Sequence, residues 1–187
     1  MRSMMERSSR FLALSGMAGI ITGLLALAGA FLAYRYFDFN PQEISGTSPV
    51  NNVILTAVTV FILAAITAYY FTWKKTVKRG EKLWNPVSKR LLFNISIPLI
   101  TGAALIIILA INGLTGLLAP LSLIFYGLGL VNASKFTYDE IRVLGLIQIV
   151  LGLIAIWNIG AGMLCWALGF GAAHIIYGIY MHNRYGK

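Results

Sequence analysis

Acidic residues are scarce in this chain, which has six Asp and Glu against fifteen Lys and Arg among 187 residues, and none of the six lies in a long apolar run. Ion- or proton-coupled transport usually places a carboxylate inside the membrane, so this shortage argues against it. One cysteine, Cys165, excludes an internal disulfide. Two histidines and this cysteine stand at no metal-ligand spacing, so we expect no metal site.

Signatures of catalysis are missing as well. The chain contains no Gly-x-Ser-x-Gly elbow and no glycine-rich phosphate loop before Lys-Ser or Lys-Thr. The only adjacent carboxylates, Asp139 and Glu140, fit helix capping and compensation of the helix dipole better than acid–base catalysis. We therefore expect no enzymatic activity and no cofactor.

Apolar runs make up most of the chain, which is 58% hydrophobic and 11% charged. Each run is close to the roughly 20 residues that cross the hydrocarbon core as a helix. No segment is left that could form a separate soluble domain. The prediction is an all-α membrane bundle, one domain over residues 1–187, with transmembrane helices at 11–34, 53–73, 91–111, 114–131, 143–159 and 161–181.

Positive charges predict how these helices are oriented. Lys and Arg are retained on the cytoplasmic side of membranes, and here all but Arg35 fall at the two ends of the chain or in alternate gaps. Both termini are therefore predicted to be cytoplasmic, in the inner (plasma) membrane. The net charge of +9 reflects this topology and contact with anionic lipid, and we expect no nucleic-acid partner. Ala28-Gly29-Ala30 has the form of a signal-peptidase site, a competing interpretation of the first run.

Turn residues predict three antiparallel helical hairpins. Asn112-Gly113 and residues 158–162 are short turns that join neighbouring runs. Asn85-Pro86 predicts a capped helix start. Residues 35–52 form the only long external loop. The strings Ile124-x-Tyr126-Gly127 and Ile175-x-Tyr177-Gly178 suggest that the hairpins are repeats of one another.

Polar residues within the runs are the candidate functional site, because such residues are costly in a membrane unless they are paired or hydrated. Gln148 and His174 lie at similar depth, roughly 10 Å from the cytoplasmic ends of their runs at 1.5 Å per residue. Gly145, Gly152 and other small residues share the face of Gln148, so a structural Gln148–His174 hydrogen bond is expected; a ligand or proton site is the alternative. The whole candidate cluster is Asn94, Ser96, Tyr126, Gln148, His174 and Tyr177.

A basic cluster between the second and third runs is the candidate contact for anionic lipid headgroups, or else a stop-transfer charge block. It contains Lys74, Lys75, Lys78, Arg79, Lys82, Lys89 and Arg90. Expected partners are membrane lipids, with a homo-oligomer or another membrane protein as a further possibility.

Several strings resemble a family of small bacterial six-helix membrane proteins without assigned function. They are Glu6-Arg7-Ser8-Ser9-Arg10-Phe11, Ile124-Phe125-Tyr126-Gly127, Asn132-Ala133-Ser134-Lys135-Phe136-Thr137 and Trp166-Ala167-x-Gly169-Phe170-Gly171-x-x-His174. The resemblance implies an inner-membrane protein and supplies no substrate or catalytic residue. Two functions are expected: a noncatalytic interaction, sensor or structural subunit, or alternatively a small-solute transporter or ligand-binding carrier.

Overall fold

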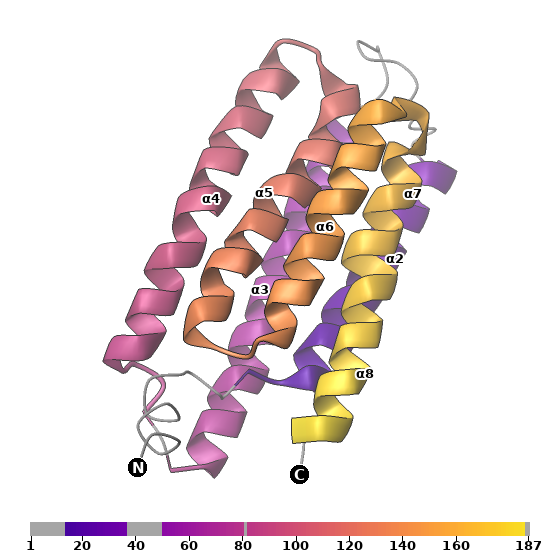
Figure 1. Cartoon of the computed structure of the whole chain (residues 1–187). Helices are drawn as coiled ribbons and strands as arrows, with labels where there is room; N and C mark the ends of the chain where they lie inside the picture. Colours follow the sequence, from indigo (N-terminus) through magenta and orange to yellow (C-terminus); the bar gives the residue numbers. More distant parts are fainter. Residues whose placement is uncertain (1–13, 37–49, 81, 186–187) are drawn as a thin grey trace.

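The computed structural model describes residues 14–36, 50–80 and 82–185, and in these ranges every regular element is a helix (Figure 1). Six of the helical stretches are long and apolar enough to cross a membrane. The prediction of an all-helical bundle with six membrane-length helices is confirmed.

The first five membrane-length stretches contain α2 (Gly16–Tyr36), α3 (Val50–Lys78), α4 (Pro86–Ile111), α5 (Leu118–Ala133) and α6 (Glu140–Trp157), and the fourth stretch, Thr115–Phe136, extends beyond α5 at both ends. Short 3-10 turns η1 (Thr115–Leu117) and η2 (Ser134–Phe136) flank α5. The α3 and α4 helices extend past the predicted runs into polar sequence, because backbone hydrogen bonding continues where side chains no longer need to be apolar.

The sixth stretch is not a uniform α-helix. It consists of η3 (Ile159–Ala161), α7 (Gly162–Trp166), a π-helical segment η4 (Ala167–Ala173) and α8 (His174–Tyr185). Segments of π-helix are rare and concentrate at functional positions, so this one marks a place to inspect.

Two local predictions from turn residues are confirmed. The Asn85 side chain accepts the backbone N–H of Ser88 at 2.8 Å, and the Ser88 hydroxyl accepts the N–H of Asn85 at 3.0 Å, which caps α4 ahead of Pro86. Gly113 follows α4 with a φ of +74°, a conformation that favours glycine. Residues 37–49, most of the loop that was predicted to be external, and the N-terminal arginines lie outside the described residues.

The helices are arranged as an open arc in the order α3, α2, α8, α6, α5, α4. The α2 helix packs on α3 and on α8, the π segment and α7 pack on α6, α6 packs on α5, and α5 packs on α4. Although α3 and α4 are consecutive in the chain, the described residues show no extensive contact between them. They therefore form the two ends of the arc.

Glycines allow the closest helix contacts in the arc. A Cβ on Gly127 of α5 would lie 2.6 Å from the Gly145 carbonyl oxygen, and a Cβ on Gly145 of α6 would lie 2.7 Å from the Gly127 carbonyl oxygen. A Cβ on Gly19 of α2 would lie 3.0 Å from the Gly178 Cα of α8. The predicted small-residue face of α6 is confirmed, since Gly145, Gln148, Gly152 and Ala155 are all buried.

Candidate functional site

A buried polar cluster lies where α5, α6 and the π segment meet. The Tyr126 hydroxyl lies 2.9 Å from His174 Nε2. His174 Nδ1 lies 2.9 Å from the Gly169 carbonyl oxygen, and the Gln148 amide donates to the same oxygen at 2.7 Å. Three of the predicted cluster residues, Tyr126, Gln148 and His174, are thus brought together around a backbone carbonyl that the sequence did not point to.

The π segment places this carbonyl. Residues five apart, such as Gly169 and His174, would be about 140° apart around an ideal α-helix. The wider turn of a π-helix brings positions i and i+5 closer to the same side of the helix. The His174 ring can therefore reach the Gly169 carbonyl oxygen of its own helix, and the Gln148 side chain reaches the same oxygen from α6. A side chain at Gly169 would collide with the Gln148 amide oxygen and would lie 2.6 Å from Leu123 Cδ2, so any larger residue there would displace these two side chains.

The hydrogen bonds define the tautomer of the imidazole. Because a carbonyl only accepts, His174 Nδ1 carries the proton and donates to Gly169, and Nε2 accepts the Tyr126 hydroxyl proton. Gln148 Nε2 approaches His174 Nδ1 only to 3.4 Å, and a protonated Nδ1 has no free lone pair to accept it. The expected direct Gln148–His174 bond is therefore replaced by two bonds to the shared Gly169 oxygen.

One polar atom of the cluster has no partner. Gln148 has no exposed surface, and its Oε1 is buried without a hydrogen bond. Reversing the amide would turn the oxygen toward the Gly169 carbonyl oxygen, so the orientation is determined. In place of a donor, Oε1 faces the Cα of Gly169, which can offer it only a weak Cα–H contact.

Aromatic rings enclose the cluster. The Tyr126 and Phe170 ring centroids are 5.0 Å apart, Phe170 stacks on His174 at 6.0 Å, and Trp166 lies 5.0 Å from Phe170. Trp166 and Phe170 were not predicted as part of the cluster. The available signal in the sequence is that Trp166, Phe170 and His174 follow one another at intervals of four residues. They make the surroundings of the imidazole apolar.

The other predicted cluster residues do not join this network. Asn94 donates to the Arg90 carbonyl and Ser96 to the Phe93 carbonyl, both within α4. Tyr177 packs, as Tyr126 also does, against an apolar cluster that includes Leu130, Tyr138 and Met181.

The basic cluster is divided by the fold. The Lys75 ammonium donates to the Leu14 carbonyl at 2.9 Å and lies 5.8 Å from the centre of the Tyr138 ring, so Lys75 is directed into the protein. The other six members, Lys74, Lys78, Arg79, Lys82, Lys89 and Arg90, are exposed.

A second polar contact, missed in the sequence, joins α6 to α8 at the end of the bundle that holds Lys75. Glu140 pairs with Arg184 at 3.4 Å and accepts the Tyr185 hydroxyl at 2.9 Å. The Tyr185 ring lies 4.5 Å from that of Tyr138. Glu140, which the sequence suggested only for helix capping and dipole compensation, lies in the first turn of α6 and connects this helix to α8.

The chemistry of the buried cluster is limited. The chain of donors runs from the Tyr126 hydroxyl to His174 and ends on a carbonyl oxygen, which is not a base, and no described carboxylate hydrogen-bonds to it. Among the described residues no three His, Cys, Asp or Glu side chains are grouped closely enough to hold a metal ion.

Comparisons with protein-family models, curated proteins and solved structures find no match for this chain.

Proposed function

We propose that this is a noncatalytic integral protein of the inner (plasma) membrane that acts as an interaction or sensor subunit. Its six helices are proposed to form three hairpins with both termini in the cytoplasm, as the distribution of Lys and Arg favours. Contacts of α2 with α3, α4 with α5 and α6 with α7 support the hairpins. The family resemblance rests on sequence strings alone and remains part of the proposal.

The observation that carries the proposal is that the polar cluster is closed. His174 is 7% exposed and Gln148 is fully buried, and both are held by the same carbonyl. A carrier site must open to water and leave polar groups free for its solute. In this cluster every polar side-chain atom except Gln148 Oε1 forms a hydrogen bond that helps to join α5, α6 and the last helical stretch.

The outer surface of α3 favours an interaction role. This helix packs mainly on α2, and no residue of its most apolar stretch is buried. Phe61, Ile66 and Tyr70 are about half exposed or more, at 57%, 59% and 49%. A helix with one neighbour can pack against a second membrane protein or a second copy without disturbing the cluster.

Cysteine labelling tests whether the cluster is closed. Ala173 precedes His174 and packs with Tyr126 on the same apolar cluster, and it makes none of the hydrogen bonds of the polar cluster. Ala173→Cys therefore adds a thiol next to the polar cluster with little change in volume. Cys165 is buried among Leu123 and Ala155, so the background is Cys165→Ala and not the more polar Ser. A membrane-impermeant thiol reagent is then added separately to each side of sealed vesicles.

We expect no labelling of Ala173→Cys from either side, and rapid labelling of Lys135→Cys from the cytoplasmic side alone. Lys135 is exposed in η2 and so reports orientation separately from the cluster. Rapid labelling of Ala173→Cys would show a hydrated path to the cluster and contradict the proposal. Labelling of Lys135→Cys from the opposite side would contradict the orientation only.

Photo-crosslinking tests the interaction role. A photoreactive residue at Ile66 of α3 is expected to give an adduct of one defined mass in intact cells, whereas one at Ile107 on the exposed face of α4 gives none. If the two positions behave alike, α3 is not an interaction surface.

A ligand-binding carrier is the second candidate, and the unpaired Oε1 of Gln148 favours it. A buried acceptor without a donor is unusual, and a solute or water bound there would supply one. The labelling result at Ala173 separates the two functions.

A further inference from the structure

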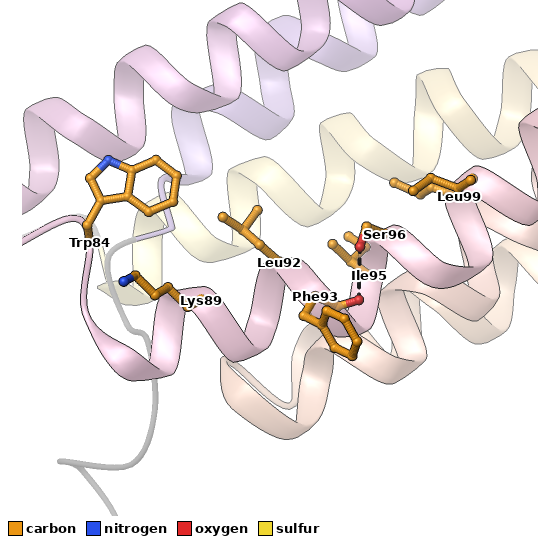
Figure 2. Close-up of a pocket in the computed structure, with 8 residues that line it drawn as sticks. Trp84, Lys89, Leu92, Phe93, Ile95, Ser96 and Leu99 are labelled. Atoms are coloured by element: carbon orange, nitrogen blue, oxygen red, sulfur yellow. Dashed lines mark hydrogen bonds between the residues drawn. The ribbon is translucent and has the colours of Figure 1, made fainter.

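A groove runs along α4 on the open side of the arc. It has a volume of about 550 Å³ and is lined by Trp84, Lys89, Leu92, Phe93, Ile95, Ser96, Leu99 and Ile100. Figure 2 shows Trp84 and Lys89 at one end of the groove and Leu99 at the other. None of these residues belongs to the buried polar cluster, so the groove is a separate feature.

The hollow has a simple origin in the sequence. Lys89, Leu92, Ser96 and Leu99 follow one another at intervals of three or four residues and share one face of α4. Ser96 is the smallest of them, and its hydroxyl is already bonded to the Phe93 carbonyl of its own helix at 2.9 Å. It leaves a dent between leucines without presenting an unmet polar group, a surface that suits an alkyl chain.

The two ends of the groove differ in polarity. Lys89 is an exposed cation at the start of α4, where no described acidic side chain is paired with it. Trp84 is 60% exposed beside it, and tryptophan prefers the headgroup level of membranes. The opposite end contains only apolar side chains. A molecule that fits both ends has an anionic head and an apolar tail.

The length of the groove matches one leaflet. Lys89 and Ile100 are separated by about 16 Å along a helix that rises 1.5 Å per residue, and half of a hydrocarbon core of about 30 Å is about 15 Å. Because α4 forms an end of the arc and has no extensive contact with α3 in the described residues, the groove is open to the bilayer from the side.

We propose that this groove binds one anionic phospholipid, with its phosphate at Lys89 and one acyl chain along Leu92, Ser96 and Leu99. The site rests on the proposed placement in a membrane and is independent of the interaction role of α3. It narrows the expected lipid contact from a diffuse cluster of basic residues to one cation and one groove.

Native mass spectrometry of the full chain tests this site. The protein is released from bilayers that contain equal amounts of phosphatidylglycerol and phosphatidylcholine. Lys89→Gln removes the cation, and Ser96→Leu fills the dent. Lys135→Gln is the matched charge control, and Thr59→Leu is the matched control for bulk, since the Thr59 hydroxyl also bonds within its own helix on an exposed face.

The wild type is expected to retain one phosphatidylglycerol in preference to phosphatidylcholine. Lys89→Gln lowers this retention about fivefold, the effect of one lysine on an anionic headgroup, and leaves phosphatidylcholine unchanged. Ser96→Leu lowers retention of both lipids, because the larger side chain fills the space of the acyl chain. Excess glycerol phosphate does not displace the lipid.

Equal effects of Lys89→Gln and Lys135→Gln would overturn the site, since charge alone would then explain the binding. If Ser96→Leu leaves lipid retention unchanged, or if glycerol phosphate displaces the lipid, the proposed position of the acyl chain is wrong. Thermal unfolding of each variant in the same detergent shows that it is folded. The Ala173 labelling experiment reports on the cluster alone, so failure of the lipid site and failure of the proposed function give different results.

Discussion

Replacing Gln148 with Met should change stability little, although this side chain is fully buried and donates one of the hydrogen bonds of the cluster. The substitution removes one interhelical bond, worth about 0.6 kcal/mol on average in a membrane protein. The Gly169 carbonyl keeps its bond from His174, so it is not left unpaired.

The same substitution removes the unpaired Oε1, and a buried polar atom without a partner costs about 1–3 kcal/mol. Methionine is unbranched and similar in volume, so the packing cost is below about 1.5 kcal/mol. The expected free energy of unfolding is within about 1 kcal/mol of the wild type. Tyr126→Phe, in contrast, leaves His174 Nε2 buried without a donor and should cost about 1–2 kcal/mol.

The assay is unfolding by sodium dodecyl sulfate in mixed micelles, followed by the helical circular dichroism signal and by tryptophan fluorescence. Asn94→Met is the control for the same change of side chain at a position where the amide bonds only within α4. If Gln148→Met costs more than about 2 kcal/mol, and more than Tyr126→Phe, then Oε1 has a partner in the membrane and the inference of a closed cluster is wrong.

Three further predictions concern the rest of the fold, each measured in the same unfolding assay. Gly127→Ala should lower the free energy of unfolding by about 2 kcal/mol, because its Cβ meets a backbone carbonyl at 2.6 Å and the helices must separate. Gly162→Ala, where the nearest neighbour is 3.9 Å from the new Cβ, should leave the free energy of unfolding unchanged. Equal effects of the two substitutions would contradict the close packing of α5 and α6. Lys75→Met should lower the free energy of unfolding by about 1 kcal/mol and make the backbone at Leu14 more susceptible to protease, while Lys74→Met should do neither. Identical digestion of the two variants would refute the inward orientation of Lys75. Asn85→Ala should cost about 1 kcal/mol through loss of the cap of α4, and an unchanged unfolding midpoint would show that the cap does not stabilise the helix.

Helices and small-residue faces could be predicted from the sequence because they depend on local properties. Hydrophobic length determines which segments can span a membrane, and close approach of helices requires Gly or Ala wherever two backbones meet. The buried side of α6 was predicted in this way from Gly145, Gln148 and Gly152, and the structure buries all three. The start of α4 was predicted from Asn85 for the same reason, since a cap is a contact between near neighbours.

The detail of the cluster could not be predicted, because it depends on a change in backbone hydrogen bonding. An α-helical interpretation of the last run places Phe170 and Gly171 next to His174, whereas the π segment brings the Gly169 carbonyl to its ring. Nothing within those seven residues alone distinguishes the two readings, since the Gln148 side chain from another helix helps to hold the carbonyl in place.

Charge counting had a similar limit. It treats all lysines as equivalent, yet Lys75 bonds to a carbonyl of a segment 61 residues away and Lys89 lines a groove. Which side of a helix a cation occupies depends on the neighbours of that helix. No pattern in the sequence indicated that α3 and α4 form the two ends of an arc.

The arc has a consequence for the synthesis of the protein. The first described helix, α2, packs on α8, the last described helix, and the glycines of both helices lie at that contact. Until the π segment and α8 are made, α2 and α3 have no extensive contact with α4, α5 and α6, and the glycine face of α2 is uncovered. A chain that terminates early would therefore remain as two separate helical bodies, which a membrane protease could distinguish from the completed protein.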